Sequence, residues 1–367
     1  SLHCLLLCSE FTLCTRARRL ICFKRWFLIS TLFIIYYVTP FSVSSQPYRN
    51  LVMEGAGVRG IAYAGALREL ERRELLMDVD KVAGTSAGAI AALCVSLGYS
   101  SNEIEKIIYE TRVNRFNDGK FLFAGGIFRL NRNFGWYKGD RFTSWLEEII
   151  EARTYNAEIT FLELHEKGFK DLYVTGTSLN RQKLIIFSYE TYPQMKIKDA
   201  VRISMSIPLY FEAVNIDSTG HVLEKGSHRK PDVDIMVDGG ITANFPIFIF
   251  DSLTTIEGTI KRIPNTQTLG FRIDTPQQID FDQSQQGLAP LPVAGFRGYL
   301  NAFYVYVIEN LNRKDLTISD WQRTVSISAG NVGPKVRRLS ASTKRLLIHN
   351  GEEAARKFFE AKPEATN

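Results

Sequence analysis

The 367-residue sequence predicts an α/β fold, in which strands and helices alternate along the chain. Residues 49–54, with the apolar centre Leu51-Val-Met53, predict a strand, and the glycine loop that follows leads into a helical pattern at residues 61–75. Residues 81–83 repeat this arrangement, because they run into a second glycine turn and then into the almost wholly apolar residues 89–97. A helix that is apolar on every side must be buried, so we expect this one at the centre of the α/β layers.

The rest of the chain continues the alternation. Similar patterns predict strands over residues 172–175, 184–187, 235–237 and 268–273, and helices over residues 101–109, 140–151 and 340–359. Two segments rich in polar and turn-forming residues interrupt them. Residues 217–234 predict a surface loop or hairpin in front of a strand, and residues 277–292 predict an exposed loop.

Composition and charge exclude some classes of protein. With 45% hydrophobic and 23% charged residues the chain is globular rather than disordered, and its net charge of +6 is modest. Part of the positive charge lies in two clusters, Arg16, Arg18, Arg19, Lys24 and Arg25, and Lys335, Arg337, Arg338, Lys344 and Arg345. Neither is interleaved with aromatic residues, so we expect solvated faces or an anionic membrane surface as partner and no nucleic acid.

The N-terminal residues 1–45 have the pattern of a leader. A basic flank precedes the apolar residues 26–38, and Pro40 and small residues follow, which is typical of a secretory signal peptide. We therefore expect a periplasmic, secreted or membrane-associated protein, with an anchor formed by the same segment as the alternative. Residues 1–23 begin with Ser and are rich in Cys, so they are a candidate non-native start. One domain is expected over residues 46–330, and a C-terminal helical extension packed on it over residues 331–367.

Cysteine and histidine are used sparsely. Cys94 is the one cysteine that follows the leader, so no disulfide framework is possible there, and its apolar surroundings predict a buried, inert thiol. No Cys/His cluster or H-x-x-H pattern is present, so the sequence predicts no metal site and no cofactor.

The second glycine turn, Gly84-Thr-Ser-Ala-Gly88, fits the nucleophile elbow G-x-S-x-G. In that elbow a sharp turn from strand to helix exposes the serine oxygen, and only small residues tolerate the crowding. The pattern is weak by itself, but here it follows a predicted strand and begins a buried helix. The alternative is a glycine-rich turn in which Ser86 caps the helix.

The first glycine loop, Gly55-Ala-Gly-Val-Arg-Gly60, has three interpretations. A dinucleotide fingerprint would need an acidic residue after the next strand, where the serine turn lies instead. A P-loop would need a following Gly-Lys-Ser/Thr, which is missing. The third is an oxyanion hole, in which free amides at a helix start stabilise the negative oxygen of a tetrahedral intermediate. Two loops at one edge of a sheet would then form one site.

Ser86 also needs a base. His165, His221, His228 and His349 all lie in polar or charged segments typical of surface histidines. Asp238 is a better candidate, because residues 235–238 place its carboxylate at the end of an apolar strand, although Asp-Gly is also a common turn. An ordinary aspartate is a poor base, so burial would have to raise its pKa.

In their order, these motifs resemble the patatin-like phospholipases. The similarity covers residues 51–246 and includes residues 200–208, which are similar to a further family segment rich in small residues. It implies a three-layer α/β/α fold with a mostly parallel central sheet, and a Ser-Asp dyad without histidine. Carried over residue by residue, it makes Ser86 the nucleophile and Asp238 the base. The oxyanion loop would comprise Gly55, Gly57, Val58, Arg59 and Gly60, with Gly84, Gly88, Gly239 and Gly240 as supporting glycines. Ala56 stands where many members have glycine.

The resemblance implies a serine esterase of the phospholipase A type that hydrolyses phospholipids or related acyl lipids. The aromatic segment at residues 116–136, with Phe121, Phe123, Phe128 and Phe134, would then form an apolar lid, a membrane-facing rim, or a packed cover. Two other functions stay open: a catalytically silent, lipid-binding member of the same fold, and a nucleotide-binding oxidoreductase that uses the glycine loop.

Overall fold

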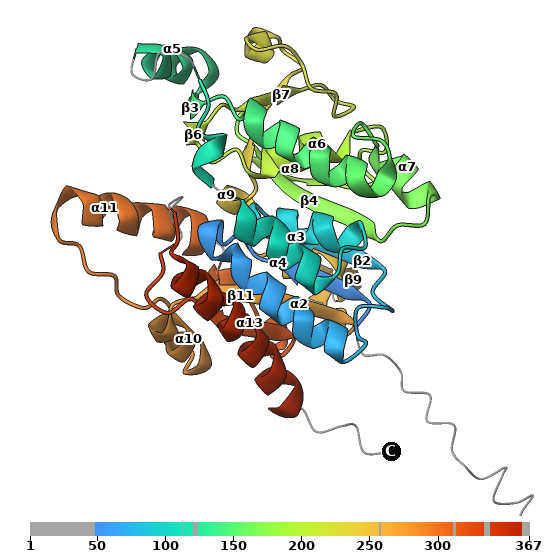
Figure 1. The fold of residues 1–367 in the computed structure, drawn as a ribbon, viewed down its shortest axis with the longest axis vertical. Helices are drawn as coiled ribbons and strands as arrows, with labels where there is room; N and C mark the ends of the chain where they lie inside the picture. The colour runs from blue at the N-terminus through green and yellow to red at the C-terminus, as the bar shows by residue number, and fades with distance from the viewer. Residues whose placement is uncertain are drawn as a thin grey trace, which may run out of the picture. The chain divides into compact units, whose positions relative to one another are not determined.

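A mixed, mostly parallel β-sheet flanked by helices forms the centre of the protein (Figure 1). The computed structural model describes residues 48–111, 113–119, 124–256, 258–310, 313–333 and 338–361. The chain from Gln46 onward forms one compact unit. The predicted leader and the two phenylalanines Phe121 and Phe123 lie outside the described residues.

The main sheet has the strand order β12-β11-β1-β2-β4-β8-β7, and β5 pairs with β4. Its strands are β1 (Asn50–Met53), β2 (Lys81–Gly84), β4 (Asp171–Ser178), β5 (Lys183–Phe187), β7 (Val214–Ile216), β8 (Asp234–Asp238), β11 (Thr268–Asp274) and β12 (Thr324–Ser328). Strands β12, β11, β1, β2 and β4 are parallel, whereas β5 and β8 run antiparallel to β4 and β7 runs antiparallel to β8. The predicted fold class and all six predicted strands are confirmed.

Strand β8 approaches the site from a direction that the sequence does not predict. We expected Asp238 at the carboxyl edge of a parallel sheet, but β8 is antiparallel to its neighbour β4. Gly84 at the end of β2 pairs with Val174, whereas Asp238 pairs with Gly176, two residues further along β4. Strand β4 extends beyond the end of β2, and β8 pairs with this extension. The last residue of β8, Asp238, therefore lies at the sheet edge where β1 and β2 end, next to the serine turn.

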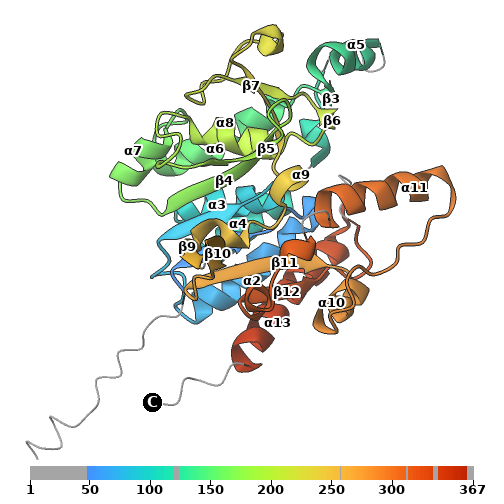
Figure 2. The same cartoon turned by 180° about the vertical axis from the view of Figure 1, so that it is seen from behind.

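The helices cover the two faces of the sheet unequally (Figures 1 and 2). Leu51 and Met53 of β1 point into the larger hydrophobic core, and Val52 between them points into a smaller one on the opposite face. The helices are α2 (Ala62–Arg72), α3 (Ala87–Ser96), α4 (Ser101–Glu110), α5 (Ala124–Asn133), α6 (Asp140–Thr154), α7 (Phe161–Glu166), α8 (Ile197–Ser204), α9 (Gly240–Ala243), α10 (Pro276–Gln283), α11 (Gly295–Tyr304), α12 (Ile318–Gln322) and α13 (Ala341–Ala361). Helix α3 is the predicted apolar helix, and it is buried along most of its length.

Short helical turns and two small sheets complete the described fold. The turns are η1 (Gly57–Ile61), η2 (Val113–Phe116), η3 (Ser227–Arg229), η4 (Ile247–Phe250), the π-helical η5 (Val305–Asn310) and η6 (Arg313–Asp315). The small sheets pair β3 (Gly135–Tyr137) with β6 (Leu209–Phe211), and β9 (Ser252–Ile256) with β10 (Thr259–Ile263). Residues 217–234 form the predicted connection in front of β8. Residues 277–292 are not all loop, because Thr275 caps α10 and Pro276 occupies its first turn.

The C-terminal helix α13 packs directly on α2. A Cβ atom built on Gly65 would lie 1.8 Å from the carbonyl oxygen of Ile348, and one built on Gly351 would lie 2.0 Å from that of Ala62. The two backbones therefore touch, and only glycine fits at either position. Among the described residues, no helix is long and apolar enough to span a bilayer.

Candidate active site

Ser86 lies in a strained turn between β2 and α3. Its backbone angles, φ 53° and ψ −122°, are unfavourable for any residue with a side chain. Gly84 and Gly88 permit the turn, since a Cβ atom on either would lie 2.3 Å from a backbone oxygen, that of Gly88 or of Met53. The backbone N–H of Ser86 donates to Ser204 Oγ at 2.9 Å. Its side chain makes no capping hydrogen bond to α3, which argues against the interpretation of Ser86 as a helix cap.

The first glycine loop lies directly against this turn. A Cβ atom on Gly55 would be 3.3 Å from Ser86 Cβ, and one on Gly60 would be 2.9 Å from Ala87 Cβ. Gly57, with φ 54°, and Val58 begin the short helix η1, and amides in a first turn have no acceptor within their own helix. The structure therefore brings the two predicted loops together.

Asn244 ties the glycine loop to the segment that follows Asp238. Its backbone oxygen accepts from the Gly55 N–H at 3.0 Å, and its side-chain amide donates to the Gly55 oxygen, also at 3.0 Å. The same amide donates to the buried Glu54 carboxylate, which forms an ion pair with the buried Arg272 at 2.6 Å. Sequence reasoning missed these three residues. The two charged residues within apolar strands were the available signal, because buried charges are rare unless they are paired.

Asp238 is 2% exposed, and its carboxylate accepts a hydrogen bond from the Gly240 N–H at 2.8 Å. Burial raises the pKa of Asp238 to about 7, against the lowering effect of hydrogen bonds from Gly240 and from the Ser86 side chain. The expected direction of the pKa shift is confirmed. Gly239 is required by packing, because a Cβ atom there would lie 2.2 Å from Thr175 Oγ1. The structure thus brings Ser86 and Asp238 together in a buried environment.

Residues 200–208, the end of α8 and the turn after it, form the third side of the site. Ser204 accepts from the Ser86 amide, and the Ser206 carbonyl accepts from the Asp238 amide at 2.9 Å. Met205 contacts Ser86 itself, with its Sδ 3.5 Å from Ser86 Oγ. Thioether sulfur is a weak acceptor, so this contact covers the serine without holding its proton strongly.

The described histidines all lie away from this site. His165 contacts Asp171 at 2.7 Å and stacks on Tyr189, and the ring of His228 packs against Phe134. His221 and His349 are exposed. None of the four lines the cavity described below. The preference for Asp238 over histidine as the base is consistent with this arrangement.

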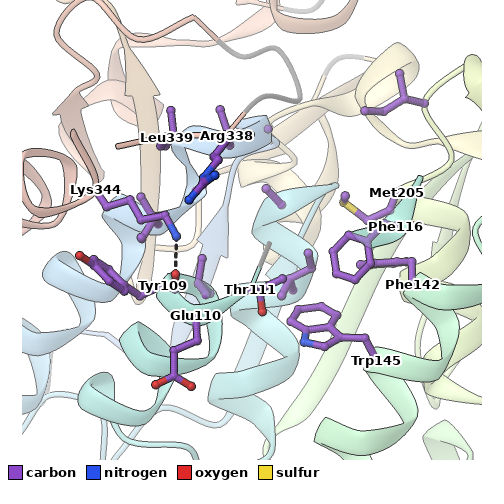
Figure 3. A pocket seen from close by; sticks show the side chains of 18 of the residues that line it. Tyr109, Glu110, Thr111, Phe116, Phe142, Trp145, Met205, Arg338, Leu339 and Lys344 are labelled. Atoms are coloured by element: carbon purple, nitrogen blue, oxygen red, sulfur yellow. Dashed lines mark hydrogen bonds between the residues drawn. The ribbon is translucent and has the colours of Figure 1, made fainter. Parts of the chain in front are cut away.

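An apolar cavity of about 290 Å³ opens beside the elbow (Figure 3). It is bordered by the glycine loop through Gly57 and Val58, and by Ala87 and Met205 from the immediate surroundings of Ser86. Figure 3 shows Phe116, Phe142 and Trp145 on one side and Arg338, Leu339 and Lys344 on the other. The Lys344 ammonium donates to the Tyr109 carbonyl, and burial together with the nearby Arg338 lowers the pKa of Lys344. The cavity is thus apolar along most of its wall and cationic at one end.

The aromatic segment at residues 116–136 has two kinds of position. Phe116 is buried in the cavity wall, whereas Phe128 and Phe134 are exposed. The start of the segment, at Phe116, is therefore a packed cover. The exposed positions Phe128 and Phe134 are candidates for the membrane-facing rim. Cys94 is buried, and burial raises its pKa to about 12, as expected for an inert thiol. In the part of the chain that the structure describes, no group of three or more potential metal ligands occurs.

Comparison with known proteins agrees with this arrangement. Residues 51–251, more than half of the chain, match the family described as "Patatin-like phospholipase". The chain belongs to the patatin-like phospholipase family. The serine turn, the glycine loop and Asp238 of this patatin-like protein all lie within the matched region. The helix α13, with Lys344, lies beyond it.

Several relatives are similar in sequence, and a solved structure has a similar fold. An uncharacterized protein of Acanthamoeba polyphaga mimivirus is 32% identical over 215 residues, 58% of this chain and 65% of the relative. A probable lipid hydrolase of Invertebrate iridescent virus 6 is 28% identical over 58% of this chain and 67% of its own length. A cGAMP-activated phospholipase of Vibrio cholerae is 26% identical over 69% of each chain. The crystal structure of VipD from Legionella pneumophila has a similar fold, with a TM-score of 0.51 and 17% identity, over 86% of this chain and 67% of VipD. The chain thus spans about two thirds of these proteins.

Proposed function

We propose that this patatin-like protein is a serine lipid acyl hydrolase that cleaves carboxylic esters of phospholipids or related acyl lipids. The observation that carries the proposal is the strained Ser86, held beside the buried Asp238 and the glycine loop at the edge of an apolar cavity. Family membership and the relatives named as a lipid hydrolase and a phospholipase support the same reaction class. The residues of the proposed reaction need no metal and no cofactor.

The reaction would follow the logic of a two-residue dyad. The Asp238 carboxylate accepts the proton of the Ser86 hydroxyl while Ser86 Oγ attacks the ester carbonyl. The amides of Gly57 and Val58 stabilise the negative oxygen of the tetrahedral intermediate. Its collapse forms the acyl-serine ester, and the departing alkoxide takes the proton from Asp238. A water molecule then gives a proton to Asp238 and attacks the acyl ester. The second tetrahedral intermediate collapses, the fatty acid leaves, and Ser86 Oγ takes the proton back from Asp238.

The pKa of about 7 suits Asp238 to this role. A base acts best when its pKa lies near the working pH, because it is then both largely deprotonated and basic enough to take a proton. An exposed aspartate, with a pKa near 3.9, would be a far weaker base. Burial at the end of β8 thus supplies the basicity that a histidine supplies in other serine hydrolases.

The cavity would hold the acyl chain. It borders both the nucleophile's neighbours and the glycine loop, so an ester carbonyl placed at Ser86 would direct one chain into it. A lipid substrate implies work at a membrane surface, which is part of the proposal. The leader pattern in the sequence supports export or anchoring as a further part of it.

The test is Ser86-dependent release of fatty acid. The unit from Gln46 onward would be assayed on phospholipid vesicles and on a soluble short-chain ester, beside Ser86→Ala and a matched Ser252→Ala variant at an exposed position. We expect Ser86→Ala to lose roughly a thousandfold or more in rate, and Ser252→Ala to lose nothing. Equal release by the Ser86→Ala variant would contradict the assignment of the nucleophile. Vesicle binding without release from either substrate would favour the silent, lipid-binding alternative.

A further inference from the structure

Helix α11 turns an apolar face toward solvent. Phe296, Tyr299, Leu300 and Phe303 follow the spacing i, i+3, i+4, i+7 and so share one side of the helix, and they are 47–74% exposed. Such a stripe normally packs on a core. Leu288, Leu291 and Val293 in the preceding segment, and Tyr306 in η5, are exposed as well. An exposed apolar helix face of this kind indicates a binding site.

This surface is connected to the catalytic edge of the sheet. Helix α11 continues into η5, and η5 packs against α9, which begins two residues after Asp238. Figures 1 and 2 both show α11 projecting from the body of the domain near α9. A ligand that binds α11 therefore lies close to the elements that hold the dyad.

A second apolar projection lies on the same side of the domain. Helix α5 carries exposed Ile127 and Phe128, and Phe134 is exposed just after it. In both views α5 and α11 extend in the same direction, with α9 and the β3–β6 pair between them (Figures 1 and 2). Two separate apolar projections that face one way suit an extended surface better than a compact protein partner.

The side chains near these projections favour a lipid surface. The Arg132 guanidinium lies 5.8 Å from the ring centre of Phe128, so an exposed cation accompanies an exposed aromatic ring. Arg338 and Lys344 add positive charge at the cavity. Tyr299 and Tyr306 combine an apolar ring with a polar tip, the combination found at the headgroup level of membranes. Apolar rings with cations beside them match the acyl and headgroup layers of an anionic bilayer.

We propose that α11 and α5 form an interfacial surface that docks the domain on bilayers containing anionic lipid. The purpose of this docking, delivery of lipid to the cavity, rests on the proposed function, but binding itself does not require catalysis. The docked orientation brings the catalytic edge of the sheet toward the membrane, so a lipid reaches Ser86 without crossing bulk water.

The experiment measures binding to vesicles by a variant that lacks the proposed nucleophile. The unit from Gln46 onward with Ser86→Ala would be sedimented with vesicles of phosphatidylcholine alone and of phosphatidylcholine with phosphatidylglycerol. The test variant adds Phe296→Ser and Phe303→Ser. The control adds Leu253→Ser and Ile260→Ser, which are 72% and 70% exposed on the β9–β10 hairpin at the opposite side of the domain. Loss of two phenylalanine anchors should weaken vesicle binding by about tenfold or more.

Three outcomes decide the proposal. It is supported if the parent and the hairpin variant bind the anionic vesicles, more tightly than vesicles of phosphatidylcholine alone, and the α11 variant does not. It is overturned if the α11 variant binds like the parent, or if sedimentation velocity shows that the phenylalanines instead hold two copies together. With Ser86 restored, the α11 variant should hydrolyse a soluble short-chain ester at the parental rate and lose release from vesicles. If no variant releases fatty acid while binding still depends on α11, the proposed function fails and the docking surface stands.

Discussion

At the scale of single residues, the site is built from two groups held in unfavourable states. Ser86 has strained backbone angles, and the Asp238 carboxyl is buried. Both states cost folding free energy, and both persist because the surrounding glycines and hydrogen bonds leave no alternative. A stability cost concentrated on two adjacent residues is expected of a catalytic site, and it can be measured.

Asp238→Asn should stabilise the protein at alkaline pH. The folded-state pKa of about 7 lies above the ordinary value of 3.8, so the native state holds this proton more tightly than the unfolded chain does. The stability that this proton contributes is fully present below about pH 4 and is lost as the pH rises through 7. At pH 8 the buried charge costs on the order of a few kcal/mol, and asparagine removes it.

Thermal unfolding at pH 5 and pH 8 checks this prediction. The gain in Tm from Asp238→Asn should be larger at pH 8 than at pH 5, whereas Asp78→Asn at an exposed position should show no such difference. A gain independent of pH would mean that the carboxyl is not buried as described.

The sequence predicted those parts of the site that short motifs specify. Ser86, Asp238 and the glycine loop each lie within a few residues of the glycines that shape their turns. Asn244, Glu54 and Arg272 were missed, because their roles come from contacts between segments distant in sequence. Their residue types alone do not distinguish them from structural residues.

At the scale of elements, periodicity predicted some of the helices but not how they pack. The pattern over residues 340–359 predicted α13, yet its contact with α2 depends on two glycines 286 positions apart, Gly65 and Gly351. Likewise the apolar alternation predicted β8, but not that it runs antiparallel. Helix α11 itself was not predicted, and a sequence also cannot show whether an apolar face is covered.

Gly351→Ala should disturb both stability and the cavity. The added methyl group would meet the Ala62 carbonyl oxygen and force α13 away from α2. Overpacking of this kind costs about 1–3 kcal/mol, and it would displace Lys344 at the cavity. Urea unfolding measures the loss, with Gly333→Ala as the control, since no atom lies within 4 Å of a Cβ atom built there. Equal stability of both variants would contradict the described contact of the two helices.

At the scale of the whole molecule, segments that are distant in sequence line the cavity together. Its wall combines η1, α3, α4, α6, the turn after α8 and the start of α13, so no single motif could have predicted it. The family resemblance implied a lipid substrate. The mostly apolar cavity wall next to Ser86 is consistent with that implication.

Ile108→Trp should shorten the acyl chain that the cavity accepts. Ile108 projects from α4 into the wall, and the larger ring would occupy space proposed for the distal part of the chain. We expect kcat/KM for long-chain esters to fall about tenfold or more, with little change for short-chain esters. Lys106→Trp on the exposed side of α4 is the matched control. Equal losses for both chain lengths would place the acyl chain elsewhere.

The pH dependence of Ser86 phosphonylation by a fluorophosphonate tests the dyad most directly. In this reaction Ser86 Oγ forms the bond to phosphorus, fluoride leaves, and Asp238 accepts the hydroxyl proton. Peptide mapping should find the label on Ser86. The rate should rise with pH to a plateau, with a midpoint near the Asp238 pKa of about 7, and it should fall by at least about tenfold in Asp238→Asn. Labelling of another serine, or an unchanged rate and midpoint in Asp238→Asn, would contradict the Ser86–Asp238 dyad.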